Sequence, residues 1–213
     1  MNLSQQAQKI IDNELAGTPK MGDLKACAKA IKQDHELASE LWSTGDLYPR
    51  LLATLIFDKK QLNQTEIESL VSDLGHHSLT TRNQISEWLL ANQLMKSKPL
   101  TALITTWQEH PNDTLRRLFW YHQARLRWTG QTPPDNSGQL LDVLESQMAD
   151  EVPEVQWAMN FCAGQIGIFE PRYRDRCINL GQTTGLYKDE VVARNCTPSY
   201  LPEFIRIEVG KRS

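Results

Sequence analysis

Apolar residues recur with helical spacing along almost the whole chain. Between residues 24 and 31, Leu24, Cys27, Ala28 and Ile31 stand at positions i, i+3, i+4 and i+7, which places them on one face of an α-helix. Similar patterns follow one another, separated by short segments that contain Gly or Pro. Strand-like alternation and Asn-Gly turns are not evident in the sequence. The sequence therefore predicts an all-α protein.

The spacing and the breaks together predict ten or more short helices. Their expected ranges are 6–15, 24–31, 35–42, a helix beginning near 49, 65–74, 80–94, 99–107, 113–128, 140–148, 153–168, 171–183 and a last one from about 201. Thr65 is the expected N-cap of its helix. Short loops between short helices favour stacked helix pairs, and a repeat of ~40 residues would give about five repeats. We expect a single domain over residues 1–213, although periodicity alone does not separate a repeat array from an irregular bundle.

Composition narrows the classes of site and location. Of the 213 residues, 40% are hydrophobic, which is enough for a core, but no apolar run approaches the ~20 residues that cross a bilayer. The four cysteines form no CxxC pair and stand at no ligand spacing to the histidines, so neither a disulfide framework nor a metal site is expected. We therefore expect a cytoplasmic protein, a monomer, that binds neither metal nor membrane.

Three stretches resemble the DNA alkylation repair family. They are KAIKQDHELASELW at residues 29–42, VQWAMNFCAGQIG at 155–167, and GLYKD at 185–189 followed by CTPSYLP at 196–202. The resemblance runs with gaps from about residue 22 over most of the chain, and the first stretch is the most specific. It rests on the order and spacing of the three stretches together rather than on any single motif.

The resemblance implies a fold and an activity. The fold is a curved superhelix of HEAT-like repeats whose concave face binds double-stranded DNA. The activity of catalytic members is hydrolysis of the N-glycosidic bond of alkylated purines such as 3-methyladenine and 7-methylguanine, without a metal or an organic cofactor. The family site holds an aspartate beside the deoxyribose, with tryptophans packed around the sugar. A fixed carboxylate suits this chemistry because breaking the bond builds positive charge on the sugar.

The chain departs from the family pattern at the catalytic positions. The family's Trp-x-x-x-Asp motif matches the segment at 78–84, where Leu79 falls at the tryptophan and Asn83 at the aspartate. An asparagine has nearly the shape of an aspartate but no charge, and such a loss typically lowers a rate by ~10²–10⁴. Phe161 stands where the family has a second tryptophan, whereas the family arginine is retained as Arg117. These changes predict weak or absent base excision.

Two neighbouring residues offer an alternative. Glu87 lies one helical turn after Asn83 and could replace the missing carboxylate, and Trp157 lies one turn before Phe161 and could replace the missing ring. The competing interpretation is that Glu87 is a solvated helix charge and Trp157 a core aromatic residue. Of the two interpretations, we favour the one in which Glu87 is a solvated charge and Trp157 a core residue.

The expected helix at 113–128 carries a possible DNA-binding face. One stripe is apolar, and the opposite side holds basic and aromatic residues, namely Arg116, Arg117, Trp120, Tyr121, Arg127 and Trp128. Arginines pair with phosphates, and aromatic rings pack on sugars or bases. The competing interpretation is a helix buried on both sides with its arginines reaching outward.

These observations favour a DNA-binding relative of the repair enzymes that recognises duplex DNA, whether or not it is alkylated, by backbone shape and charge. Because the net charge is −3, we expect a modest and salt-sensitive affinity. One alternative is an active glycosylase, which needs an acid near Arg117. Another is a protein–protein scaffold, which would present an exposed apolar patch instead of a positive strip.

Overall fold

The structure is a computed structural model that describes residues 3–129 and 132–212, and these residues form helices and connecting turns without a β-strand. Within these ranges, no helix is both long and apolar enough to cross a bilayer. The chain divides into two compact units, one ending at Thr106 and the other beginning at Trp107. Each unit is described by itself below.

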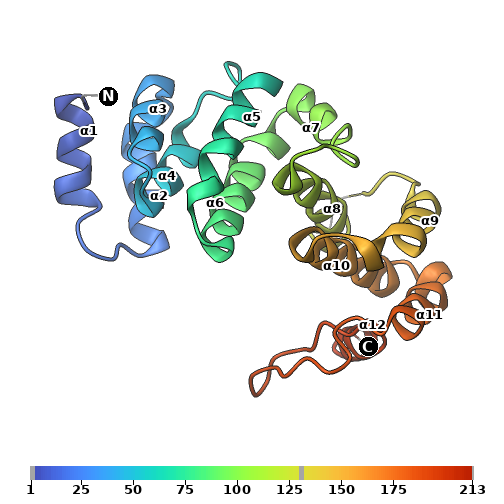
Figure 1. Ribbon diagram of the computed structural model, residues 1–213. Coiled ribbons are helices and arrows are strands. Elements are labelled where there is room, and N and C mark those ends of the chain that lie inside the picture. Colours follow the sequence, from blue (N-terminus) through green and yellow to red (C-terminus); the bar gives the residue numbers. More distant parts are fainter. Residues whose placement is uncertain (1–2, 130–131, 213) are drawn as a thin grey trace. The chain divides into compact units, whose positions relative to one another are not determined.

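The first unit contains seven α-helices among its described residues (Figure 1). They are α1 (Gln5–Lys9), α2 (Met21–Ile31), α3 (His35–Ser43), α4 (Leu47–Ile56), α5 (Gln64–Ser72), α6 (Leu79–Asn92) and α7 (Lys98–Ile104). The expected α-helix at 6–15 is wrong in its second half, because Ile10–Glu14 forms a π-helical turn. The expected cap of α5 is also wrong: the Asn63 side chain accepts from the amide of Glu66 at 3.1 Å, so the helix begins before Thr65.

Helix α4 is the centre of the first unit and packs against α2, α3 and α6. Its residues Leu51, Leu52 and Ile56 are fully buried. Arg50 is buried as well, and it donates hydrogen bonds to the carbonyl oxygens of Trp42 (3.1 Å) and Asp73 (3.0 Å). Its guanidinium also lies 5.2 Å from the centroid of the Trp42 ring. Arg50 thus connects α3, α4 and the turn after α5, which explains a charged residue in an otherwise apolar helix.

The second unit contains five α-helices among its described residues. They are α8 (Asp113–Trp128), α9 (Ser137–Gln147), α10 (Pro153–Phe169), α11 (Arg174–Thr184) and α12 (Leu201–Gly210). Asn112 caps α8 by accepting from the amides of Thr114 and Leu115, and the helix has the bounds that the sequence predicts. Helix α10 packs against α8, α9, α11 and α12 and is the centre of this unit (Figure 1).

Two glycines allow α12 to pack closely on its neighbours. A Cβ at Gly164 of α10 would lie 2.5 Å from Cε1 of Phe204, and a Cβ at Gly181 of α11 would lie 2.6 Å from Cβ of Leu201. Such distances are too short for any larger residue, so the positions of Phe204 and Leu201 depend on these glycines.

The expectation of all-helical architecture is confirmed. The expectation of one domain over residues 1–213 stays a prediction. A helical array is held together by contacts between neighbouring helices, so a division into two compact units does not decide whether the array is one domain.

Candidate nucleic-acid interface

Helix α8 is buried on more than one side. Residues of both expected faces are inaccessible, among them Leu118, Trp120, Tyr121 and Arg127. Trp120 is 1% exposed and packs edge-on against Phe119, with ring centroids 5.1 Å apart. Trp120 is therefore a core residue here, contrary to its expected place on a ligand-facing side of the helix.

Arg127 is also placed differently from the expectation. Its side chain is fully buried and its Nε donates to Oε1 of Glu170 at 2.7 Å. The remaining donors go to the backbone oxygen of Gln123 (2.8 Å), Oδ1 of Asn136 (3.1 Å) and the hydroxyl of Ser137. Burial and this set of acceptors indicate a structural cation that joins α8 to the start of α9 and the end of α10.

Arg116 is half-buried and carries two ion pairs. Its Nη2 lies 2.8 Å from Oδ1 of Asp113 and 3.1 Å from Oε2 of Glu151, and its Nη1 donates to the carbonyl of His110 at 2.8 Å. Two carboxylates neutralise its charge, so Arg116 adds little positive potential to the surface around it.

The structure brings together several of the residues singled out from the sequence in one group of rings, here called the aromatic cluster. Its members come from α8, α10 and α12 and are Tyr121, Trp128, Trp157, Phe161 and Phe204. The rings of Trp157 and Phe161 are stacked, with centroids 5.3 Å apart and planes 11° from parallel. Tyr121 is stacked on Phe161 at 5.9 Å and 24°. Rings held in this way keep fixed orientations.

Arg117 lies inside this cluster. Its guanidinium carbon is 5.5 Å from the centroid of Tyr121 and 5.4 Å from that of Trp157. The residue is only 3% exposed. A cation between two ring faces both fixes the rings and makes the local potential more positive. In this structure Arg117 therefore acts on the surface mainly through the rings that it orients.

The exposed part of the aromatic cluster contains a second cation–π pair. Trp128 is 44% exposed, and the half-buried Arg125 places its guanidinium carbon 5.3 Å from the Trp128 centroid. The half-buried Trp157 and Phe161 complete this surface. The sequence placed Trp128 on the basic and aromatic face of this helix, but the prediction missed Arg125 and Phe204. The signal for Arg125 was present in the spacing of the basic and aromatic residues along α8.

The two residues aligned with the family's Trp-x-x-x-Asp motif, Leu79 and Asn83, lie on α6 in the first unit, together with the proposed replacement Glu87. Leu79, at the start of the helix, is 43% exposed, while Asn83 and Glu87 are half-buried. Their spacing of four residues puts them along one side of the helix. The Oδ1 atom of Asn83 is buried and accepts no hydrogen bond from the described residues. Whether Glu87 serves as a replacement acid stays a prediction.

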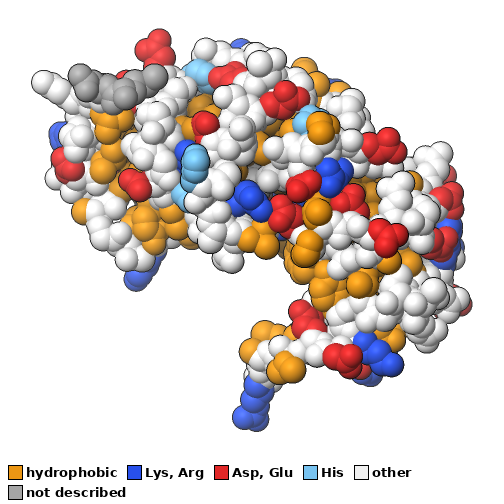
Figure 2. All heavy atoms as spheres, viewed as in Figure 1, with side chains coloured by type: hydrophobic (Ala, Val, Ile, Leu, Met, Phe, Trp, Pro, Cys, Tyr) orange, Lys and Arg blue, Asp and Glu red, His pale blue; other side chains and the backbone are white. Residues whose placement is uncertain are grey.

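Basic residues on α11 are paired with the acidic segment before α10. Arg176 contacts Asp142 (2.6 Å) and Glu145 (2.7 Å), and Arg172, just before the helix, contacts Asp135. On the face drawn in Figure 2, Lys and Arg side chains lie among Asp and Glu side chains, whereas hydrophobic side chains gather over α10. The charges of Arg172 and Arg176 are therefore balanced locally by carboxylates.

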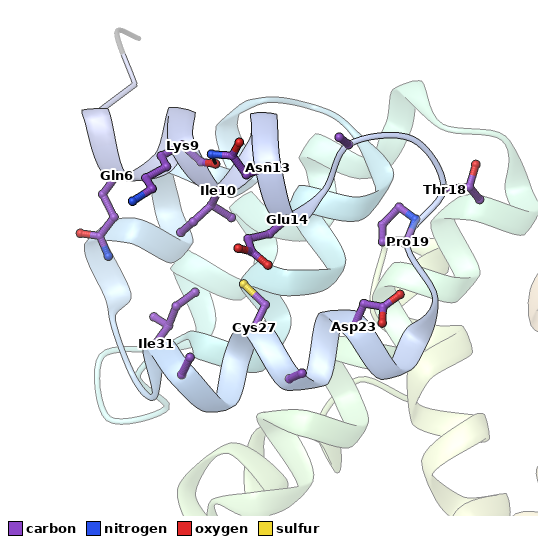
Figure 3. A pocket seen from close by; sticks show the side chains of 13 residues that line it. Gln6, Lys9, Ile10, Asn13, Glu14, Thr18, Pro19, Asp23, Cys27 and Ile31 are labelled. Atoms are coloured by element: carbon purple, nitrogen blue, oxygen red, sulfur yellow. Dashed lines mark hydrogen bonds between the residues drawn. The ribbon is translucent and has the colours of Figure 1, made fainter.

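A groove of about 960 Å³ lies in the first unit between α1, the π-helical turn and α2. Cys27 and Glu14 lie close to each other in it (Figure 3). Burial, followed by the charge of Glu14, raises the pKa of the Cys27 thiol, which disfavours the nucleophilic thiolate. None of the residues that were proposed for catalysis or DNA binding lines this groove, and its chemistry points to no particular reaction.

Comparison with known proteins identifies the family. The family model described as DNA alkylation repair enzyme matches residues 12–178. The chain belongs to this family. The resemblance to the DNA alkylation repair family that was seen in the sequence is thus confirmed over most of the chain.

A solved structure agrees with this assignment at the level of the fold. It is described as a new family of proteins related to the HEAT-like repeat DNA glycosylases with affinity for branched DNA structures. The match has a TM-score of 0.70 and 18% sequence identity, and it covers 98% of this chain and 89% of the other. The DNA alkylation repair family member therefore has the HEAT-like fold that the sequence predicted. No curated protein matches the sequence.

Proposed function

We propose that the protein binds DNA through the exposed part of the aromatic cluster and recognises the DNA by its backbone shape and charge, with little or no base excision. The observation that carries this proposal is the pairing of cations with oriented rings at Arg117 and Arg125. Guanidinium groups attract phosphates, and exposed rings pack on sugars and bases. Membership of the DNA alkylation repair family supports a DNA ligand over other polyanions.

The expectation of weak base excision rests on Asn83. The amide at this position supplies no negative charge for a developing sugar cation. Arg116 and Arg127, which were expected to bind DNA, are held in ion pairs with Glu151 and Glu170. Two of the expected phosphate ligands are thus held within the protein, so we expect a modest affinity that falls with salt.

The test is fluorescence anisotropy with labelled duplex DNA at two salt concentrations, with release of 7-methylguanine followed in the same samples. We expect salt-sensitive binding by the wild type without base release. Trp128→Ala should weaken binding at least several-fold, because stacking of a base on an aromatic ring contributes about 1–3 kcal/mol. Arg125→Ala should also weaken binding several-fold, and the loss of one phosphate contact should reduce the slope of log K against log salt concentration by about 1. Arg117→Ala should weaken binding as well, together with a change in tryptophan fluorescence.

Arg176→Ala is the matched control. It removes the same charge from a surface where Asp142 and Glu145 already neutralise it, so duplex affinity should not change. Equal losses in Arg125→Ala and Arg176→Ala would show that only net charge matters and would contradict the proposed surface. Release of 7-methylguanine would instead support an active glycosylase, and Glu87→Gln would be the next variant.

A protein–protein scaffold is the second candidate function. The specific observation in its favour is the 44% exposure of Trp128 beside half-buried rings, since exposed apolar groups often mark protein contacts. An absence of DNA binding at low salt would favour it. We expect the protein to act as a monomer in the cytoplasm, and analytical ultracentrifugation of the free protein checks the first of these expectations.

A further inference from the structure

A small cavity lies beside the aromatic cluster, where α10, α12 and the segment before α12 meet. Its volume is about 160 Å³, and its walls are Trp157, Asn160, Phe161, Phe204 and the segment 197–199. Pockets for drug-sized ligands usually exceed ~300 Å³, whereas a cavity of ~150 Å³ accepts a single benzene-sized ring. The cavity therefore has room for one ring and not for a whole nucleotide.

The walls favour a flat ring. Phe161 and Phe204 have centroids 6.2 Å apart with their planes tilted by 47°, and Trp157 is stacked on Phe161. The place of Phe204 is set by Gly164, because any larger residue there would collide with its ring. Aromatic faces bind the faces of nucleobases whatever the base sequence.

Asn160 gives the cavity a polar group with a fixed direction. The residue is 3% exposed, and its Nδ2 donates to the carbonyl of Ser199 at 2.8 Å. Its Oδ1 accepts no hydrogen bond from any described residue. A buried acceptor without a donor is unfavourable, so a ligand that brings an N–H group is stabilised there.

We propose that this cavity accepts an unpaired pyrimidine base of the bound DNA, stacked against Phe161 and Phe204 and donating an N–H group to Asn160. A pyrimidine has a single ring and carries N–H donors on its pairing edge, and these donors are available only when the base is unpaired. A purine has two fused rings, so it is longer than a pyrimidine and we expect it to fit less well between Phe161 and Phe204. This inference rests on the proposed DNA binding. It adds that the same surface prefers DNA that contains an unpaired pyrimidine.

The test compares labelled duplexes that differ only at the centre, which is fully paired or carries one unpaired thymine, one unpaired adenine or one unpaired abasic linker. Affinity is measured by anisotropy for the wild type, Asn160→Leu, Phe204→Leu and the control Arg176→Ala. The readout is the ratio of the two Kd values, paired over unpaired. Because both values come from the same preparation, the folded fraction cancels in this ratio.

For the wild type we expect the unpaired thymine to bind about tenfold tighter than the paired duplex, which corresponds to about 1.4 kcal/mol. The adenine and abasic duplexes should show a smaller preference. Asn160→Leu and Phe204→Leu should bring the thymine ratio close to one, and Arg176→Ala should keep the wild-type ratio.

Two results would overturn the cavity proposal alone. One is equal affinity of the wild type for the thymine, adenine and abasic duplexes, and the other is an unchanged thymine ratio in both cavity variants. In either case, salt-sensitive duplex binding that Arg125→Ala weakens would leave the proposed function standing. Failure to bind any of these DNAs at low salt would overturn the proposed function and the cavity proposal with it.

Discussion

Replacing Arg127 separates two interpretations of this residue. The sequence predicts a DNA contact, whereas the structure buries the side chain completely and pairs it with Glu170 at 2.7 Å. Arg127→Leu would leave the Glu170 carboxylate, whose side chain is 17% exposed, with the Ser137 hydroxyl and a longer ion pair to the exposed Arg172 at 3.8 Å, but without its buried cation. Removing one partner of a buried pair typically destabilises by about 3–5 kcal/mol, and we expect a loss at the lower end of that range because Arg172 still balances part of the charge.

Arg127→Lys should also be destabilising, though less so. A single ammonium group cannot reach Glu170, Asn136 and Ser137 together in the way that the planar guanidinium does. The assay is urea unfolding followed by far-ultraviolet circular dichroism and by tryptophan fluorescence, with agreement of the two signals required before a free energy is derived.

Arg176→Ala is the matched control for this experiment. Its ion pairs with Asp142 and Glu145 are at the surface, with carboxylate side chains 70% and 41% exposed, so the urea midpoint should stay at the wild-type value. If Arg127→Leu unfolded at the wild-type urea concentration and lost DNA affinity instead, the structural role assigned to Arg127 would be refuted.

Three further predictions concern other parts of the molecule. Burial, followed by the nearby charge of Arg125, lowers the pKa of His122 to about 4, so this residue stabilises the fold above its unfolded pKa of about 6.5. That stability, up to about 3 kcal/mol, is lost as the pH falls from about 6.5 to about 4, and unfolding of His122→Gln should show a correspondingly weaker pH dependence. Gly181→Ala should destabilise the second unit by about 1–3 kcal/mol because its Cβ would meet Leu201, which a thermal melt would detect. Burial raises the pKa of the Cys162 thiol to about 12, so a thiol reagent should modify the exposed Cys196 in the native protein and reach Cys162 only after unfolding.

Much of the fold is predictable from the sequence because the helices are amphipathic and have clear ends. The bounds of α8 agree with the expected range, since Asn112 caps its first turn. The π-helical turn at Ile10–Glu14 was not predicted, because an added residue in one turn leaves the apolar spacing nearly unchanged.

The candidate site was predicted only in part, and the errors share one cause. Periodicity shows which face of α8 is apolar, but it does not show which further sides of the same helix are covered by the rest of the fold. Trp120 and Arg127 lie on such sides and are buried. Tyr121 and Phe161 were singled out separately, and their stacking was not predicted. The place of Phe204 depends on Gly164, a contact between distant residues that no local pattern reveals.

The enclosure of α8 has a consequence for synthesis on the ribosome. Its buried cation needs Glu170, which follows Arg127 by 43 residues. At translation rates of about 5–20 residues per second, that separation corresponds to roughly 2–9 s during which α8 has left the exit tunnel without its main partner. Its rings and its arginine remain in water over that interval, where chaperones that bind exposed apolar segments can reach them. The second unit therefore completes its folding late, after α10 has emerged, while the first unit can already be folded.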